Sequence, residues 1–229
     1  MEKTSRTDLL IGKEKSSLIK SLKIAVFGVG GVGGFAVEAL IRSGVENIAV
    51  FDADSIEETN VNRQIIATSE NLGKDKVSVI KERAESINKN AKVTAIKTFY
   101  LPENADLYPL TKYDYIIDAI DTITAKIELI KRAKIAGVPI ISCMGTGGKL
   151  NPLSLKIADI KDTKVCPLAK VIRKKLKDEG IENVKVVYSE ELPKKSENVE
   201  RKEIPSMIFV PATAGLLMAL EVIKDLVDL

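Results

Sequence analysis

The stretch Ile24-Ala25-Val26-Phe27-Gly28-Val29-Gly30-Gly31-Val32-Gly33 sets a short apolar run directly before a glycine-rich turn. Glycines at such a turn let the backbone approach phosphates, and the N-terminus of a following helix favours an anion. We therefore expect a strand at 24–28, a helix at 31–43 and a nucleotide-binding loop with contacts from Gly28, Gly30, Gly31 and Gly33. A purely structural glycine turn is the alternative.

Asp52 closes the next apolar run, about 20 residues after the glycine loop. A carboxylate at this place in a dinucleotide-binding fold accepts hydrogen bonds from ribose hydroxyls. A hydride-transferring dehydrogenase would show the same two features. The loop and the acid together predict nucleotide binding, and they leave the reaction open.

Outward from this loop, short β-branched runs alternate with longer helical patterns, which is typical of a parallel sheet wound with crossover helices. The expected strands are 24–28, 47–51, 93–97, 115–119 and 139–142, and the later helices are 74–88 and 125–136. The interval 98–112 is ambiguous, and we expect loop with a short helix. The predicted fold class is α/β, a Rossmann-like doubly wound, mostly parallel sheet.

Both ends add elements to this sheet. An interrupted apolar pattern before the first strand predicts an N-terminal helical extension over 1–22. A C-terminal α/β extension is expected to contain an extended segment at 149–160, a helix opening at Pro167, a strand at 184–188 and a closing helix at 212–228. The charged, aperiodic run 189–203 predicts a mobile loop.

Composition excludes several kinds of chemistry. The 229 residues carry 35 Lys and Arg against 32 Asp and Glu, a net charge of +3, and include no His. The chain therefore has no Ser-His-Asp or Cys-His nucleophile pair and no imidazole metal site. Its two cysteines, Cys143 and Cys166, form no Cys-x-x-Cys pair, so a reducing cytoplasm is the simplest setting. The longest apolar stretch, 208–220, is too short to span a bilayer, and we expect no membrane insertion.

The block after the second strand departs from a dehydrogenase. Residues 52–64 read Asp-Ala-Asp-Ser-Ile-Glu-Glu-Thr-Asn-Val-Asn-Arg-Gln, and Lys76 follows in Gly73-Lys74-Asp75-Lys76. With Asp118-Ala119-Ile120-Asp121, this order resembles the ubiquitin-activating-like superfamily, which includes the ThiF-like activators of sulfur-carrier proteins. The resemblance implies ATP binding by Asp52, Asp54, Asn60 and Gln64, phosphate catalysis by Arg63 and Lys76, and a Mg²⁺ site at Asp121.

These residue types suit adenylation. When a carboxylate attacks the α-phosphate of ATP, charge builds on phosphate oxygens that Arg, Lys and Mg²⁺ stabilise. A carboxylate is already ionised at neutral pH, so the absence of His does not hinder the reaction. Surface ion pairs for Arg63 and Lys76, and a turn role for Asp121, are the alternative roles.

Within the superfamily the chain is most similar to the tRNA threonylcarbamoyladenosine dehydratases. The resemblance lies in Arg6-Thr7-Asp8-Leu9-Leu10-Ile11-Gly12, Asn62-Arg63-Gln64-Ile65, Gly145-Thr146-Gly147-Gly148-Lys149-Leu150-Asn151-Pro152 and Pro167-Leu168-Ala169-Lys170. It implies that 23–229 is an adenylating domain that activates the threonylcarbamoyl carboxylate of tRNA adenosine 37. The side chain then cyclises with loss of water, and adenylate leaves. It also implies a homodimer in which Arg6 reaches the neighbouring subunit's phosphates.

Two other functions stay open. One is an adenylating activator of a small sulfur-carrier protein, although such activators commonly carry the Cys-x-x-Cys zinc pairs that this chain lacks. The other is a nucleotide-binding regulatory module without turnover, against which the complete set of Arg63, Lys76 and Asp121 argues. The sequence also leaves open a bound monovalent cation (K⁺ or Na⁺) and a sulfurtransferase or cysteine desulfurase partner.

Two further features have both a functional and a structural interpretation. Cys166 stands at a helix entrance, where the helix dipole favours a thiolate, so a persulfide or acyl relay competes with a packing role. The helix after Pro167 is basic, and it is either a tRNA-backbone footprint or a solvated face; its cations are Lys170, Arg173, Lys174, Lys175 and Lys177.

Overall fold

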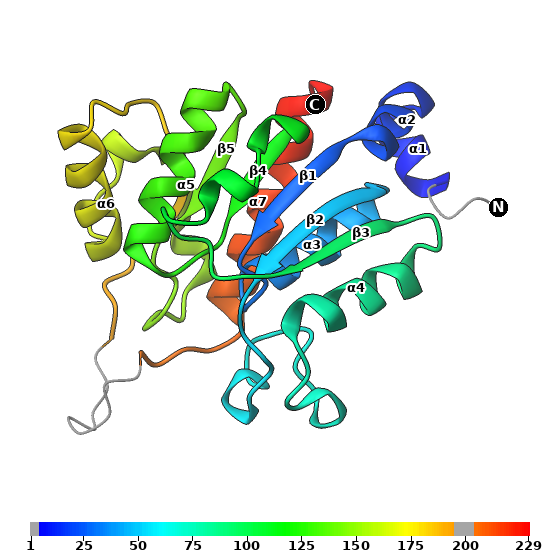
Figure 1. Ribbon diagram of the computed structural model, residues 1–229, viewed down its shortest axis with the longest axis horizontal. Helices are drawn as coiled ribbons and strands as arrows, with labels where there is room; N and C mark the ends of the chain where they lie inside the picture. Colours follow the sequence, from blue (N-terminus) through cyan, green and yellow to red (C-terminus); the bar gives the residue numbers. More distant parts are fainter. Residues whose placement is uncertain (1–4, 195–203) are drawn as a thin grey trace.

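The computed structural model describes residues 5–194 and 204–229, and Figure 1 shows their arrangement around one sheet. Within these residues the strand order is β3-β2-β1-β4-β5-β7-β6. Every pairing is parallel except that of β6 with β7, which is antiparallel. The strands are β1 (Lys23–Phe27), β2 (Asn47–Asp52), β3 (Lys92–Lys97), β4 (Tyr115–Asp118), β5 (Ile140–Cys143), β6 (Leu155–Asp159) and β7 (Lys185–Ser189). The predicted doubly wound α/β class is confirmed.

Helices cover both faces of the sheet (Figure 1). One face packs against α2 (Lys13–Ser21), α3 (Gly33–Ser43), α4 (Lys76–Ile87) and α7 (Phe209–Val227). The other packs against α5 (Ile123–Ala136) and α6 (Pro167–Asp178). The remaining helix, α1 (Ser5–Ile11), contacts α2, and together they lie beside the start of β1.

The central strand β1 shows why its sequence is apolar without alternation. Ile24 and Val26 belong to the core on one face, whereas Ala25 and Phe27 belong to the core on the other. A parallel strand covered on both faces must be apolar at every position. Phe27 stacks on Phe51 of β2 at 4.1 Å between ring centroids, so this aromatic pair fixes the ends of two neighbouring strands.

The C-terminal helix α7 packs directly on the start of α3. A Cβ placed on Gly215 would lie 2.3 Å from the carbonyl oxygen of Val32, much closer than real atoms approach. The two helix backbones therefore touch, and α7 supports the turn from which α3 begins.

Several boundaries differ from the sequence-based expectation. The N-terminal helical region is two helices, because Gly12 takes φ 88° between them. Helix α7 begins at Phe209 rather than 212, since Pro211 is tolerated in a first turn where its missing N–H costs nothing. Segment 149–160 is β6 with a 3₁₀ turn on each side, at Pro152–Ser154 and Ile160–Asp162. The 98–112 interval contains the 3₁₀ turns Ala105–Leu107 and Leu110–Lys112.

Only the first part of the charged run 189–203 lies within the described residues. Its first residue, Ser189, still belongs to β7, and 190–194 have no helix or strand. Most of the expected mobile loop, 195–203, lies outside the described residues. No helix in the described parts of the chain is long and apolar enough to cross a bilayer.

Candidate functional site

A cavity of about 930 Å³ opens at the carboxyl ends of β1, β2, β4 and β5. This edge is the topological switch point of the sheet, where β1 has β2 on one side and β4 on the other, and open α/β sheets bind ligands there. Most of the expected site residues line it, namely Gly28, Gly30, Gly31, Asp52, Asp54, Arg63, Gln64, Lys76 and Asp121. Gly33, Asn60 and Arg6 are not among its lining residues.

The glycine loop separates into positions that face the cavity and positions that serve packing. Gly28 has φ 84°, and a Cβ there would lie 2.7 Å from the Ala119 carbonyl oxygen. A Cβ on Gly33 would lie 1.8 Å from the carbonyl oxygen of Gly28, so Gly33 allows the loop to fold onto the first turn of α3. Gly30 and Gly31 leave the backbone accessible from the cavity.

The carboxylate of Asp52 ties β2 to the glycine loop. Its Oδ2 accepts a hydrogen bond from the Val29 N–H at 2.8 Å, and its Oδ1 accepts one from the Asp54 N–H at 2.9 Å. Burial raises the pKa of Asp52 above its ordinary value, against the opposing charge of Lys76 and these two N–H groups. Each oxygen keeps a lone pair for a further donor, such as a ribose hydroxyl.

Residues 53–75 form a long connection whose end pairs with its beginning, and this pairing positions Lys76. Ser55 and Asp75 form an antiparallel bridge, and the Lys76 N–H donates to the Asp54 carbonyl at 3.0 Å. The Lys76 side chain, 7% exposed, reaches the Asp54 carboxylate with an Nζ to Oδ2 distance of 2.7 Å. The sequence predicted both residues for the site but not their ion pair.

The turn at 57–64 presents Arg63 and Gln64 to the cavity. Asn60 holds this turn from within: its side chain accepts the Glu57 N–H, and its carbonyl accepts the N–H groups of Arg63 and Gln64. Arg63 donates to the Thr59 carbonyl at 2.7 Å and to Asn62 Oδ1 at 3.0 Å. The Gln64 Oε1 is buried with no hydrogen-bond partner among the described residues. A donor on a bound nucleotide would satisfy it.

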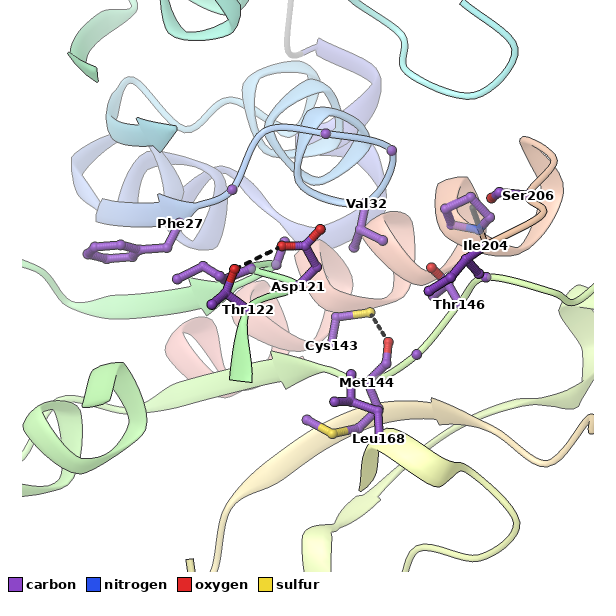
Figure 2. Close-up of a pocket in the computed structure, with 18 of the residues that line it drawn as sticks. Phe27, Val32, Asp121, Thr122, Cys143, Met144, Thr146, Leu168, Ile204 and Ser206 are labelled. Carbon is purple, nitrogen blue, oxygen red and sulfur yellow. Dashed lines mark hydrogen bonds between the residues drawn. The ribbon is translucent and has the colours of Figure 1, made fainter. Parts of the chain in front are cut away.

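Asp121 is exposed on the turn after β4, where its side chain faces the cavity beside Thr122 and Cys143 (Figure 2). Asp118 holds this turn by accepting the Ile120 N–H at 3.1 Å. The other Asp118 oxygen accepts from Lys126 Nζ at 2.8 Å and from Ser142 Oγ at 2.6 Å, and none of these three side chains reaches solvent. Sequence analysis missed this network, because its members come from three elements.

The cavity continues past β5 along a wall for which the sequence suggested only a candidate relay at Cys166. Cys143 and Cys166 both line it, and burial raises the pKa of the Cys143 thiol to about 12, so Cys143 is a neutral thiol at physiological pH. Lys149 is 3% exposed; its Nζ donates to the Gly145 carbonyl at 2.7 Å, and burial lowers its pKa. In the sequence, the segment around Lys149 indicates only the family resemblance and predicts no role for Lys149.

Two arginines with expected functional roles do not line the cavity. Arg6 is exposed on α1, a helix that lies beside the start of β1 (Figure 1). The cavity lies at the opposite, carboxyl ends of the strands. Arg173 of the basic helix is committed to the loop before it, donating to the carbonyl and the hydroxyl of Thr163. The other cations of α6 are exposed, namely Lys170, Lys174, Lys175 and Lys177.

The carboxylates of the site fit Mg²⁺ only as part of a nucleotide complex. Among the described residues no three Cys, Asp or Glu side chains cluster as a metal site. Mg²⁺ in nucleotide enzymes is commonly held by one or two carboxylates together with substrate phosphates. Asp121, placed after β4 next to the glycine loop, is suited to such shared coordination.

The sheet order, the glycine loop and Asp52 at the end of β2 are typical of a nucleotide-binding domain of the doubly wound α/β class. The ThiF family model matches residues 4–229, and the chain belongs to this family. A tRNA threonylcarbamoyladenosine dehydratase of Bacillus subtilis is 43% identical over 97% of this chain and 93% of its own. The crystal structure of E. coli tRNA N6-threonylcarbamoyladenosine dehydratase with ATP superposes with a TM-score of 0.91 at 32% identity, covering 99% of this chain and 94% of that one. Its complex with AMP gives the same TM-score and identity. The resemblance stated from the sequence is confirmed.

Proposed function

We infer that this protein is an ATP-dependent tRNA threonylcarbamoyladenosine dehydratase. The inference depends on one observation: the glycine loop and Asp52 line the same cavity as Arg63, Lys76 and Asp121. Close relatives across nearly the whole chain bear that name. The alternative, activation of a sulfur-carrier protein, has less support, because the chain has no Cys-x-x-Cys pair.

The reaction follows from the charges at the strand ends. The threonylcarbamoyl carboxylate attacks the α-phosphorus of ATP, pyrophosphate leaves, and an acyl adenylate forms. The carbamoyl group then attacks the activated carbonyl, adenylate leaves with the carboxylate oxygen, and one proton is released; the side chain has lost one water. Arg63 and Lys76 stabilise the charge that builds on the phosphates, and Asp121 would hold Mg²⁺, which would supply further positive charge.

The direct test supplies ATP, Mg²⁺ and tRNA carrying the threonylcarbamoyl group, and measures the modified nucleoside by mass spectrometry. We expect loss of one water, with formation of AMP and pyrophosphate. A parallel reaction with a carrier protein ending in Gly-Gly tests the alternative. Adenylation of the carrier without any change in the tRNA would overturn the proposal.

Further parts of the proposal extend beyond the cavity. We propose that the protein is a cytoplasmic homodimer in which Arg6 completes the partner's site. We also propose that the basic face of α6 contacts tRNA and that the enzyme requires K⁺ or Na⁺. Exchange of K⁺ for Na⁺ or choline at constant ionic strength tests the last. A sulfurtransferase or cysteine desulfurase partner also stays a prediction, and co-purification of the tagged protein tests it.

A further inference from the structure

The cavity has two ends that differ in charge. Its nucleotide end, along β2, β1 and β4, includes three carboxylates, from Asp52, Asp54 and Asp121, and two cations, from Arg63 and Lys76. Beyond β5 its lining residues include two lysines, Lys149 and Lys194, and no Asp or Glu. Figure 2 shows this second region, where Thr146 lies beside Ile204 and Ser206, on the far side of Cys143 from Thr122.

Lys149 is a buried cation whose charge is not matched by a carboxylate. Its side chain makes hydrogen bonds to two carbonyl oxygens, of Gly145 at 2.7 Å and of Ser189 at 3.5 Å. None of the ion pairs within residues 5–194 and 204–229 includes it. Glu191, the acid whose charge acts on it, directs its carboxylate to the N–H groups of Leu150 and Asn151. A buried ammonium that forms no ion pair is costly, and an anionic ligand would offset that cost.

A helix N-terminus faces the same region. Pro167 and Leu168, the first residues of α6, line the cavity together with Cys166. The first N–H groups of a helix have no acceptor within it, and the Cys166 side chain at the capping position makes no hydrogen bond to them. The positive end of the helix dipole therefore adds to the charge of Lys149.

We propose that the region beyond β5 is a carboxylate-binding subsite, in which Lys149 and the N-terminus of α6 hold the substrate carboxylate for attack on ATP. The sheet order supports the placement: the proposed ribose contact, Asp52, is at β2, the proposed phosphate and Mg²⁺ contacts are at β1 and β4, and β5 is the next strand. Neighbouring strands are about 4.8 Å apart, so a group held after β5 is adjacent to phosphates held after β4. The inference rests on the proposed function, because it takes the acyl substrate to be a carboxylate.

The test separates carboxylate recognition from turnover. The probes are the free nucleoside N6-threonylcarbamoyladenosine and its methyl ester, titrated by calorimetry in the presence of a non-hydrolysable ATP analogue. We expect the wild type to bind the acid at least about 10-fold more tightly than the ester, since the neutral ester cannot form a charge-assisted hydrogen bond. Lys149→Met should bind both equally, with unchanged affinity for the analogue.

Controls keep the result interpretable. Lys161→Met removes the same charge from an exposed position outside the cavity and should keep the preference for the acid. Lys149→Gln replaces Lys149→Met if the methionine variant does not fold. A folded Lys149 variant that still prefers the acid would overturn the subsite. Failure of the wild type to dehydrate modified tRNA would instead overturn the proposed function, and that assay does not depend on Lys149 substitutions.

Discussion

Lys76 and Asp54 illustrate how the site is balanced at the level of single residues. Their 2.7 Å ion pair satisfies a lysine that is almost wholly buried, whereas the Asp54 side chain is 58% exposed. A phosphate that approaches Lys76 therefore competes with a carboxylate that can turn to solvent. Arg63, by contrast, donates to a backbone carbonyl and an amide oxygen, and its guanidinium retains further donors for phosphate oxygens.

Arg63 should matter more to turnover than to ATP binding. Charge on the phosphates is greater in the transition state than in the resting complex, so the guanidinium gains interaction energy as the reaction proceeds. We expect Arg63→Ala to lower kcat about 10³-fold while raising the Kd for ATP less than about 10-fold. Pyrophosphate exchange and calorimetry measure the two quantities. Arg63→Lys, which keeps the charge without the planar fork, should recover part of kcat; equal losses in kcat and affinity would indicate ground-state binding alone.

Asp52 predicts a pH dependence for nucleotide binding. The ribose hydroxyls need an ionised acceptor, and burial raises the pKa of this carboxyl above its ordinary value. As pH falls through this raised pKa, Asp52 takes up a proton, and ATP binding weakens at a higher pH than an ordinary aspartate would cause. We compare the ATP affinities of the wild type and Asp52→Asn as a ratio at each pH. Protonation of ATP itself affects both proteins equally and therefore cancels in the ratio. We expect the ratio to be largest at neutral pH and to fall toward one in acid; a constant ratio would exclude ribose binding by the carboxylate.

Helices α3 and α4 are joined by one buried acid. Glu38 of α3 accepts hydrogen bonds from Arg83 Nε at 2.7 Å and Nη2 at 3.0 Å, and from Arg42 Nε at 2.7 Å. Burial works to raise the pKa of Glu38, but the hydrogen bonds and charges of Arg83 and Arg42 together lower it below its ordinary 4.5. The contact between α3 and α4, on one face of the sheet, thus depends on one ionised group.

Loss of this charge should destabilise the fold without altering the chemistry. We expect Glu38→Gln to lower the free energy of unfolding by about 1.5–3 kcal/mol at neutral pH, the range for hydrogen bonds to charged groups. Because the folded pKa lies below the unfolded one, the stabilisation is present above about pH 4.5 and is lost as pH falls through the folded value. Urea unfolding at pH 7 and pH 3.5 measures this difference. A destabilisation of equal size at both pH values would mean that packing, rather than charge, joins the helices.

The exposed face of α6 should contact RNA through its lysines. Lys170, Lys174 and Lys177 are exposed, whereas Arg173 holds the preceding loop and is left unchanged in the test. Changing the three lysines to Gln should weaken tRNA binding and lower the salt slope by about 0.7–0.9 for each phosphate that a lysine no longer neutralises. Lys13, Lys89 and Lys112, also exposed, give a control triple variant of equal charge. If both triple variants bind tRNA with the same slope, α6 is not part of the interface.

At the scale of the whole molecule, sequence periodicity predicted the sheet because each strand and helix is defined by local spacing. The glycine loop and Asp52 were likewise predictable, since a single turn and strand end position them. Lys149 and the Asp118, Lys126 and Ser142 network were not, because their burial depends on how distant segments pack. Asn60 shows the intermediate case: its place in the motif is evident, but only the folded turn reveals that its hydrogen bonds are internal.

The position of Arg6 makes a prediction about assembly. It is on α1 and does not line the cavity of its own chain, so the proposed role in catalysis requires a neighbouring subunit's site. Arg6→Ala and Lys76→Ala should each be inactive alone. After mixing and subunit exchange, about a quarter of wild-type activity should return, because half of the dimers are mixed and each has one intact site. No recovery despite proven exchange would place Arg6 outside catalysis.

The packing of α7 on α3 also limits how this chain can change over generations. Every replacement of Gly215 adds a Cβ, and that atom would meet the Val32 carbonyl at the turn where the glycine loop becomes α3. A lineage that acquires any other residue there must also move the C-terminal helix or the nucleotide loop. Position 215, far along the chain from any reacting group, should therefore be among the slowest to diverge.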